Sequence, residues 1–283
     1  MLFMLLSATA AAQANIAEPK SGHSRAGAGG LKIGVVPYSG GKRAISAWLP
    51  LASFLREKLQ QPVLIVTAPN HKEFYNRIQE GRYFLIVSSP HVAAAMIRHD
   101  QAIPVRMLTI PISARLVVRR DSPFTSLLSL NGKSISTTTA GAFTSLLLEH
   151  EIKLISQQQP FSVNTRYGNS HAEALRNLLN NRTDAAYVSK LPHTKSTVEQ
   201  FETLKIIEHS SITSHPMIIT PASLGTSHAA AMGLLLDQFA EQASPANPGL
   251  SPFSGDPRFT FRPIKQAVLD QLTPLVVTWL KQR

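Results

Sequence analysis

Short apolar runs alternate with amphipathic segments along most of the chain. Residues 32–36 form such a run and stop at Pro37, which is typical of a buried parallel strand that opens into a loop. Residues 44–59 repeat apolar positions at helical spacing, with Pro50 tolerated only if the regular helix begins close to it. The elements predicted for this half are strands at 32–36, 63–67, 83–88 and 104–109 and helices at 44–59, 71–80 and 90–98.

A second series of the same kind follows a junction near Pro111. Such alternation favours mostly parallel sheets with helices on both faces, and 283 residues are enough for two units. We therefore expect a two-lobed α/β fold with a cleft, in which 31–110 and 222–283 form one lobe and 111–221 the other. Segments near 110–114 and 220–223 would join them as a hinge. The elements predicted here are strands at 113–119, 133–137, 163–167, 185–188, 204–208 and 217–220 and helices at 142–152, 171–180, 227–242 and 264–281.

The first 14 residues form an uncharged, mostly apolar run that is too short to span a bilayer and ends in Ala12-Gln13-Ala14. This pattern predicts a signal peptide, with a buried N-terminal helix as the alternative. Residues 15–30 have no periodicity and indicate a flexible lead-in. No later stretch has about 18 uninterrupted apolar residues, so we expect a soluble, periplasmic mature chain that does not span the membrane.

The formal net charge is +11, and none of it lies in residues 1–14. The cations are scattered and aromatic residues make up only 7%, which disfavours nucleic acid as a partner and favours attraction of a small anion. Simple solubility is the alternative reading of the charge. The chain has no cysteine, which excludes disulfides, thiol catalysis and a thiol-linked lipid anchor. It also lacks nucleophile-elbow, phosphate-loop and zinc-protease motifs, so we expect no enzyme, no catalytic residue, no metal and no cofactor.

The most informative segment runs from Ser136 to Gly141, where four consecutive hydroxyl residues lie between a predicted strand and a predicted amphipathic helix. Hydroxyls and free amides at a helix N-terminus form a ready anion site. An ordinary helix cap, which needs only one such residue, is the alternative. Ser88 and Ser89 precede another helix in the same way, and two helix N-termini facing across a cleft could hold one oxyanion.

Three further residues are candidates for ligand contacts. His71 and His171 each follow a short polar turn at the start of a predicted helix and could donate to an anion, although a lone surface histidine is usually only solvated. Asp184 could orient a cationic group of the ligand, although aspartate before a strand is also a common turn residue.

The order of these motifs resembles the phosphate/phosphite/phosphonate substrate-binding proteins of ABC transporters, over about residues 31–240. Each motif is weak by itself, and their order and spacing carry the resemblance. The matching segments are Gly34-Val35-Val36-Pro37, Trp48-Leu49-Pro50, Ala68-Pro69-Asn70-His71, Ser88-Ser89-Pro90, Thr138-Thr139-Ala140-Gly141, 170–175, 183–186 and 214–219.

The resemblance implies a type II periplasmic binding protein, a Venus-flytrap whose lobes close on the ligand. The family's Ser-Thr-Ser-Gly clamp corresponds to Thr138, Thr139, Ala140 and Gly141. An often aromatic ligand contact corresponds to His71, and the family's histidine near a second-lobe helix corresponds to His171. Ala140 lacks the hydroxyl that the family has, and a Tyr-Gly-Asn type of turn is replaced at 88–90, so the ligand could differ from a phosphonate.

The function expected from these residues is capture of a phosphonate, phosphite or phosphate-like ligand by hinge closure, for uptake through an ABC permease. The same fold could instead report to a membrane sensor such as a kinase or cyclase, and a diverged site could bind a partner protein. We expect Thr139→Ala to weaken anion binding by at least about 1 kcal/mol, because a hydrogen bond to a charged group is lost.

Overall fold

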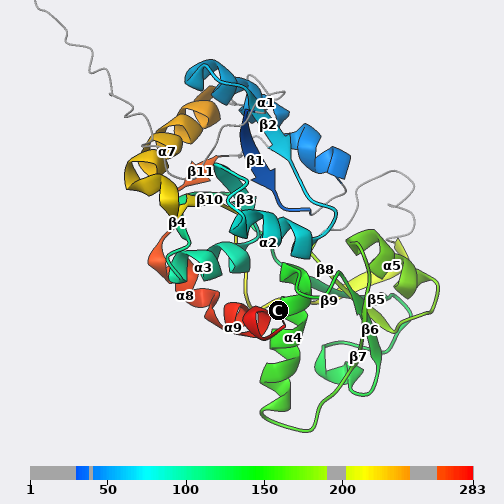
Figure 1. Ribbon diagram of the computed structural model, residues 1–283. Coiled ribbons are helices and arrows are strands. Elements are labelled where there is room, and N and C mark those ends of the chain that lie inside the picture. The colour runs from blue at the N-terminus through cyan, green and yellow to red at the C-terminus, as the bar shows by residue number, and fades with distance from the viewer. Residues whose placement is uncertain (1–29, 38–40, 190–201, 243–259, 283) are drawn as a thin grey trace, which may run out of the picture.

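The computed structural model describes residues 30–37, 41–189, 202–242 and 260–282 of the chain. The predicted signal peptide and nearly all of the predicted lead-in lie outside the described residues. The described strands form two sheets, each in its own lobe (Figure 1). The prediction of a two-lobed α/β fold is therefore confirmed.

The first sheet has the strand order β11-β4-β10-β3-β1-β2. Strands β1, β2 and β3 are parallel, whereas β10 runs antiparallel to both of its neighbours, β3 and β4. The strands are β1 (Leu31–Val35), β2 (Val63–Val66), β3 (Leu85–Ser88), β4 (Ala102–Leu108), β10 (Met217–Pro221) and β11 (Phe261–Arg262).

Helices cover both faces of this sheet (Figure 1). Helices α1 (Gly41–Leu59) and α7 (Gly225–Gln242) bury Trp48, Leu51 and Phe239 against one face. Helices α2 (His71–Gln79) and α3 (Pro90–Arg98) cover the other. Gly34 is needed in β1 because a Cβ there would lie 2.5 Å from the ring of Tyr83, which packs across the strand.

The second sheet has the strand order β7-β6-β8-β5-β9. Strand β6 is parallel to β7 and β8, and β5 is antiparallel to β8 and β9. The elements are β5 (Arg115–Arg119), the short helix η1 (Leu128–Leu130), β6 (Ser134–Thr137), α4 (Phe143–Ser156), β7 (Asn164–Tyr167), α5 (His171–Leu179), β8 (Ala185–Val188) and β9 (Leu204–His209).

The prediction of mostly parallel sheets is wrong, and so is the position of one boundary. Both sheets are mixed, and β10 lies inside the first sheet, so 217–221 do not belong to the second lobe. The return crossing is therefore at 210–216 rather than near 220–223. The outgoing crossing, 109–114, includes the predicted segment, and the two crossings bond each other through a bridge between Ile112 and Ser214, with N–O distances of 2.6 and 3.0 Å.

Two helix predictions also need correction. Pro50 lies in the middle of α1, because the packing of Trp48 and Leu51 against the sheet outweighs the hydrogen bond that proline cannot donate. The predicted helix at 264–281 is two helices, α8 (Gln266–Gln271) and α9 (Thr273–Lys281), with Pro274 in the first turn of α9. Another short helix, η2 (Ala222–Leu224), precedes α7.

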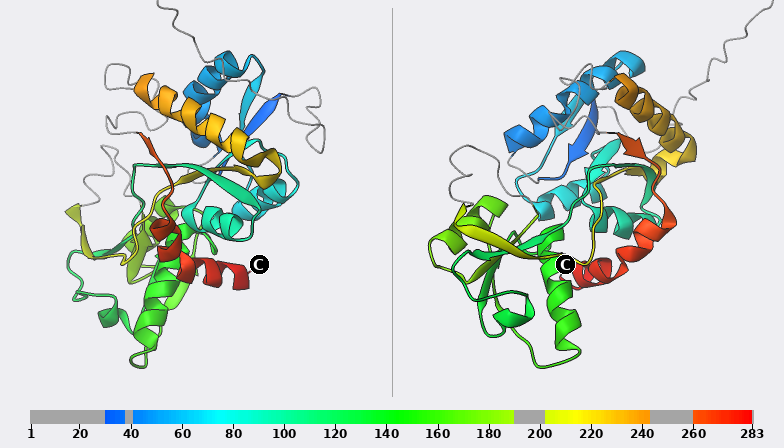
Figure 2. Two further views of the ribbon diagram at one scale, coloured as in Figure 1. Left: turned by 90° about the vertical axis from the view of Figure 1, so that its left-hand side faces the viewer. Right: turned by 180° about the vertical axis from the view of Figure 1, so that it is seen from behind.

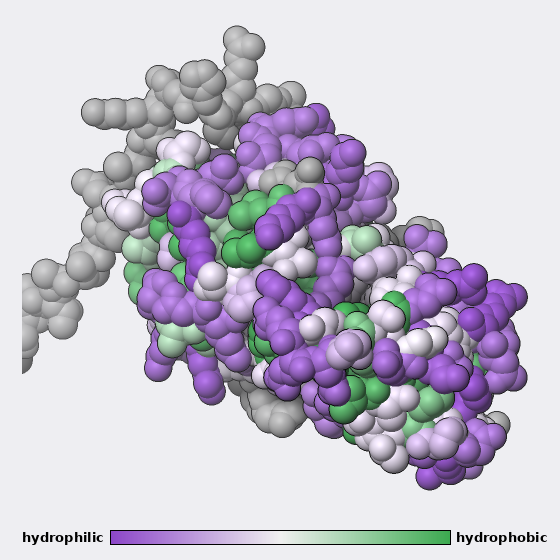
Figure 3. Space-filling model, turned by 90° about the horizontal axis from the view of Figure 1, so that it is seen from below, coloured by the Kyte–Doolittle hydropathy of each residue, from purple (hydrophilic) through white to green (hydrophobic). Residues whose placement is uncertain are grey.

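Helix α9 joins the two lobes, because it packs against both α3 and α4 (Figure 2). One continuous apolar cluster includes Trp279 of α9 together with side chains from both lobes. Figure 3 shows that the face seen from below is largely hydrophilic, with small separate hydrophobic areas. Among the described residues, no helix combines the length and the apolar character that a membrane span requires.

Candidate functional site

Helices α2, α3, α4 and α5 each follow the carboxyl end of a strand, and their first turns are built in two ways. In α2 the Asn70 side chain accepts a hydrogen bond from the Glu73 amide at 2.8 Å, and in α5 the Ser170 side chain accepts one from the Glu173 amide at 3.1 Å. Neither α3 nor α4 has a side-chain cap. The first-turn amides of α3 and α4 are therefore not occupied by a capping side chain.

These two uncapped N-termini come from different lobes and meet each other. The ring of His91, the second residue of α3, stacks on the ring of Phe143, the first residue of α4. Their centroids are 5.9 Å apart and their planes differ by 12°. The N-terminal ends of both helices, where the helix dipole is positive, therefore lie close together between the lobes, which favours negative charge there.

Several polar side-chain atoms at this junction are buried and have no hydrogen-bond partner among the described residues. They are the hydroxyls of Ser88, Ser89 and Thr138 and both ring nitrogens of His91. Ser88 and His91 are fully buried, and Thr138 is 6% exposed. Buried polar groups are rarely left unpaired, because each one costs its lost hydration. These atoms therefore indicate a place that a polar ligand would complete.

The return crossing adds two residues of the same kind. The Ser214 hydroxyl and Nδ1 of His215 are also buried and have no partner among the described residues. Met217 lies opposite Ser88 in the antiparallel pair of β10 and β3, so the chain before Met217 passes the start of α3. The return crossing thus reaches the candidate site directly.

His91 and His71 are held in their neutral form by burial. Burial and, to a smaller extent, the nearby His71 lower the pKa of His91, the backbone of Gly141 raises it, and the resulting pKa is about 3. Burial also lowers the pKa of His71 itself. The first residues of α2 and α3 therefore lie close together, and they bring two neutral imidazoles to the junction.

The turn before α4 is shaped by Gly141, which adopts a φ of +75° that a residue with a side chain rarely adopts. A Cβ at Gly141 would lie 3.7 Å from both Trp279 and Gln282, so the C-terminal helix approaches this turn closely. Trp279 also packs edge-on against His91, with centroids 5.5 Å apart. Helix α9 therefore closes one side of the junction.

Of the residues predicted from the sequence, Ser88, Ser89, Thr138, Gly141 and His71 lie at or beside this junction. Thr139 and Ala140 lie in the same turn, but their side chains differ. The Thr139 hydroxyl donates to the Gly168 carbonyl at 3.2 Å, and Ala140 is exposed and has no polar side-chain atom.

His171 and Asp184 have other partners. His171 shares a hydrogen bond of 2.9 Å with the Ser189 hydroxyl, at the carboxyl ends of β7 and β8. Asp184 lies at the amino end of β8, where its carboxylate accepts bonds from the amide and the hydroxyl of Ser134, the first residue of β6. Burial acts to raise the pKa of Asp184, but these bonds hold it below the ordinary value. Asp184 is thus a full strand length from the Thr138 turn.

Sequence reasoning named Ser88 and Ser89 but did not select His91, Ser214 or His215. His91 follows those serines directly and could have been included as the next residue of the same helix start. Ser214 and His215 lie in one of the segments that carry the family resemblance, but nothing local selected them as ligand contacts, because their place beside α3 depends on the position of β10 in the first sheet. No cluster of three or more potential metal ligands occurs among the described residues.

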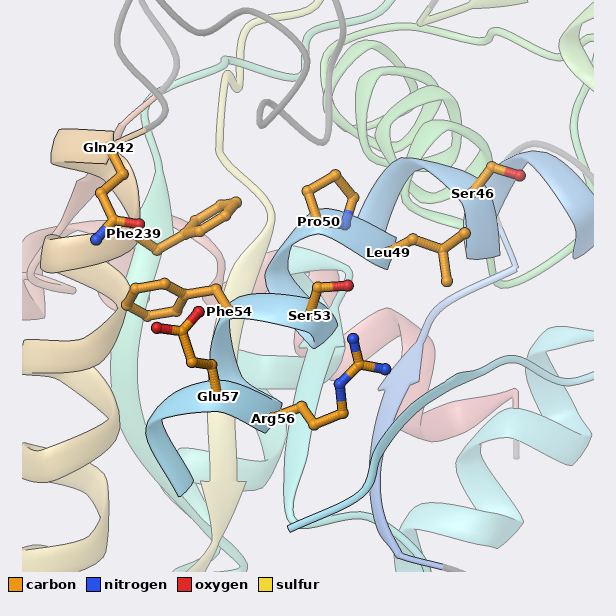
Figure 4. A pocket seen from close by; sticks show the side chains of 9 residues that line it. All are labelled: Ser46, Leu49, Pro50, Ser53, Phe54, Arg56, Glu57, Phe239 and Gln242. Atoms are coloured by element: carbon orange, nitrogen blue, oxygen red, sulfur yellow. The ribbon is translucent and has the colours of Figure 1, made fainter. Parts of the chain in front are cut away.

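An open hollow on the described surface lies elsewhere. It is about 760 Å³ in volume and lies between α1 and α7, where Phe54, Phe239, Arg56 and Glu57 are among the lining side chains (Figure 4). It contains none of the partnerless buried polar atoms. The buried polar junction is therefore the better candidate for ligand binding.

One family model matches most of the chain. The model of the periplasmic substrate-binding proteins of phosphonate ABC transporters matches residues 33–236. A search of curated proteins finds no match to this sequence.

Many solved structures have the same fold. XAC2383 from Xanthomonas citri bound to ATP has a TM-score of 0.71 and 16% identity, covering 89% of this chain and 97% of its own. PhnD1 from Prochlorococcus marinus in complex with methylphosphonate has a TM-score of 0.71 and 10% identity, covering 89% and 98%. The periplasmic aliphatic sulphonate binding protein SsuA from Escherichia coli has a TM-score of 0.68 and 14% identity, covering 89% and 92%.

Proposed function

Because the chain belongs to the periplasmic phosphonate substrate-binding proteins of ABC transporters, we propose that it captures a small oxyanion between the N-termini of α3 and α4. The family binds substrates for transport and is not a family of enzymes. One observation carries the proposal: two uncapped helix N-termini from different lobes meet at His91 and Phe143, beside buried polar atoms that have no partner.

The chemistry of the junction suits an oxyanion. Ser88, Ser89 and Thr138 can each donate one hydroxyl proton, and the first-turn amides of α3 and α4 can donate more. Hydrogen bonds to a charged acceptor are shorter and about twice as strong as neutral ones. Burial strengthens them further, because little water competes for the donors. A tetrahedral oxyanion has enough acceptor sites to pair with donors from both lobes.

Contacts between the ligand and both lobes would also favour closure of the lobes around the ligand. A ligand that touches only one lobe binds the open and closed forms equally and shifts nothing. An oxyanion held by Ser89 on one side and Thr138 on the other favours the closed form by the contacts that the open form cannot make. The paired crossings at Ile112 and Ser214 are where the lobes would rotate.

The ligand class that we propose is phosphonate, phosphite or another phosphate-like anion. The family model and the methylphosphonate complex of PhnD1 support it, and the sulphonate-binding protein SsuA shares the fold. All of these ligands carry a tetrahedral oxyanion, which is the part that the junction would hold. We further propose that the protein delivers the ligand to an ABC permease.

A thermal-shift screen of the mature protein with methylphosphonate, phosphite, phosphate, sulfate and methanesulfonate tests the proposal. A ligand that binds only the folded state raises the melting temperature. We expect a shift with at least one oxyanion and a weaker shift for the variant Thr138→Val. A folded protein whose melting temperature does not respond to any of these anions would refute the proposed function.

A further inference from the structure

Two aromatic side chains from other helices hold the ring of His91 in one orientation. Its ring lies against Phe143 on one side and against the edge of Trp279 on another, with centroids 5.9 and 5.5 Å away. The side chain is fully buried. Rotation of the ring would break both contacts, so the directions of its two nitrogens are set by packing.

The hydrogen-bonding capacity of this ring is limited by its protonation state. A neutral imidazole has one N–H, which can only donate, and one lone pair, which can only accept. The backbone of Gly141 lies close enough to favour a proton on the ring, although by distance and angle neither nitrogen forms a hydrogen bond to a described residue. The lone pair therefore needs a donor from the ligand.

We propose that His91 selects the protonation state of the bound oxyanion, by accepting a hydrogen bond from a ligand oxygen that still carries its proton. This inference rests on the proposed function, because it concerns the same junction. A monoprotonated phosphonate, phosphite or phosphate provides such an O–H, together with unprotonated oxygens for the surrounding hydroxyls and amides. A sulfonate has oxygens that only accept, and it leaves the lone pair of His91 facing another lone pair.

The surroundings of His91 keep the ring neutral for this role. Burial lowers the pKa of His91 to about 3, so the lone pair is present throughout the neutral range. Among the described residues, His71 on α2 is the titratable group that acts on His91, and it disfavours a second proton on the ring. Helices α4 and α9 present Phe143 and Trp279 to the ring, and neither carries a charge.

The test compares methylphosphonate with methanesulfonate, which has almost the same shape but no ionisable proton in the neutral range. Dissociation constants are measured by titration calorimetry below and above the second ionisation of methylphosphonate. We expect the wild type to prefer methylphosphonate by about ten-fold at the lower pH, because an unpaired buried group is costly, and to lose most of this preference at the higher pH. Methanesulfonate, whose charge does not change, corrects for titration of the protein itself.

Two variants separate the lone pair from the shape of the ring. His91→Phe keeps an aromatic ring between Phe143 and Trp279 but removes both nitrogens, and we expect the preference for methylphosphonate to fall to about three-fold or less. His91→Gln keeps an acceptor oxygen, and we expect it to retain more of the preference than His91→Phe. The wild-type comparison requires no substitution, so it decides the question even if a variant does not fold.

The possible failures are distinguishable. If the folded wild type binds both probes equally, or if its preference does not depend on pH, the role of His91 is refuted while the proposed function stands. An unchanged preference in His91→Phe refutes it as well. If neither probe binds to the folded wild type, both the proposed function and this inference are overturned.

Discussion

Replacing Thr138 by valine removes one hydroxyl and keeps the size and the branched shape of the side chain. Thr138 is 6% exposed, and its hydroxyl has no partner among the described residues. In the free protein this hydroxyl is therefore a cost, on the order of 1 to 3 kcal/mol for a buried polar group without a partner. In the complex it would donate to the oxyanion, which is worth about 1.5 to 3 kcal/mol.

The two effects of Thr138→Val should have opposite signs. We expect the free variant to be as stable as the wild type or more stable, with a melting temperature up to several degrees higher, since about 1 kcal/mol shifts a chain of this size by about 2 to 4 °C. We expect methylphosphonate binding to weaken by about ten-fold to a hundred-fold. Scanning calorimetry of the free protein and titration calorimetry with methylphosphonate measure the two effects separately.

Thr139→Val is the matched control, because it makes the same chemical change one residue later. The single proton of the Thr139 hydroxyl is already donated to the Gly168 carbonyl, at 3.2 Å. We expect this variant to lose about 1 kcal/mol of stability. Its affinity for methylphosphonate should fall by less than that of Thr138→Val. The reasoning is refuted if Thr138→Val binds like the wild type, or if Thr139→Val loses more affinity while keeping its stability.

Three further predictions concern stability. Trp279→Ala should destabilise the fold by about 3 to 5 kcal/mol, measured by denaturant unfolding, because it empties the apolar contact between α9 and both lobes; a loss below about 1 kcal/mol would contradict this. Asp237→Ala leaves Arg106, whose side chain is 19% exposed and bonded to Asp237 at 2.9 and 2.7 Å, without its partner, so the melting temperature should fall while ligand affinity stays unchanged. Asp184→Asn should lower the free energy of unfolding at neutral pH, because the folded state holds the pKa of the Asp184 carboxyl below its ordinary value near 3.8. The difference from the wild type should shrink as the pH falls below that value and vanish below the folded pKa, where the carboxyl is protonated in both states. A difference that persists in acid refutes the assignment.

The sequence determined the local features of the fold. Apolar runs, helical spacing and turn residues predicted the main described strands and helices, because these signals act over a few residues. Prediction failed where tertiary packing outweighed them, as at Pro50, which lies inside α1. It also failed for β10, because an apolar run does not indicate which sheet the strand joins or in which direction the strand runs.

For the candidate site, too, the sequence predicted local patterns but not tertiary contacts. The hydroxyl-rich segment at 136–141 and the serines at 88–89 could be recognised from the sequence, because hydroxyl residues before a helix are a local pattern. Their hydrogen bonds could not be predicted, because a hydroxyl is free or occupied according to what lies beside it in space. The Gly168 carbonyl occupies Thr139 and leaves Thr138 without a partner, and no local feature distinguishes these two threonines.

Only the tertiary structure brought His91 to the junction and placed Asp184 at the opposite end of its sheet. Both outcomes depend on contacts between residues about 50 or more positions apart. Such contacts are set by strand register and by the packing of α3 against the second lobe. Both depend on the packing of the whole core, and no short segment of the sequence specifies them. The sequence by itself thus determined which groups could bind an anion, and the fold decided which of them meet.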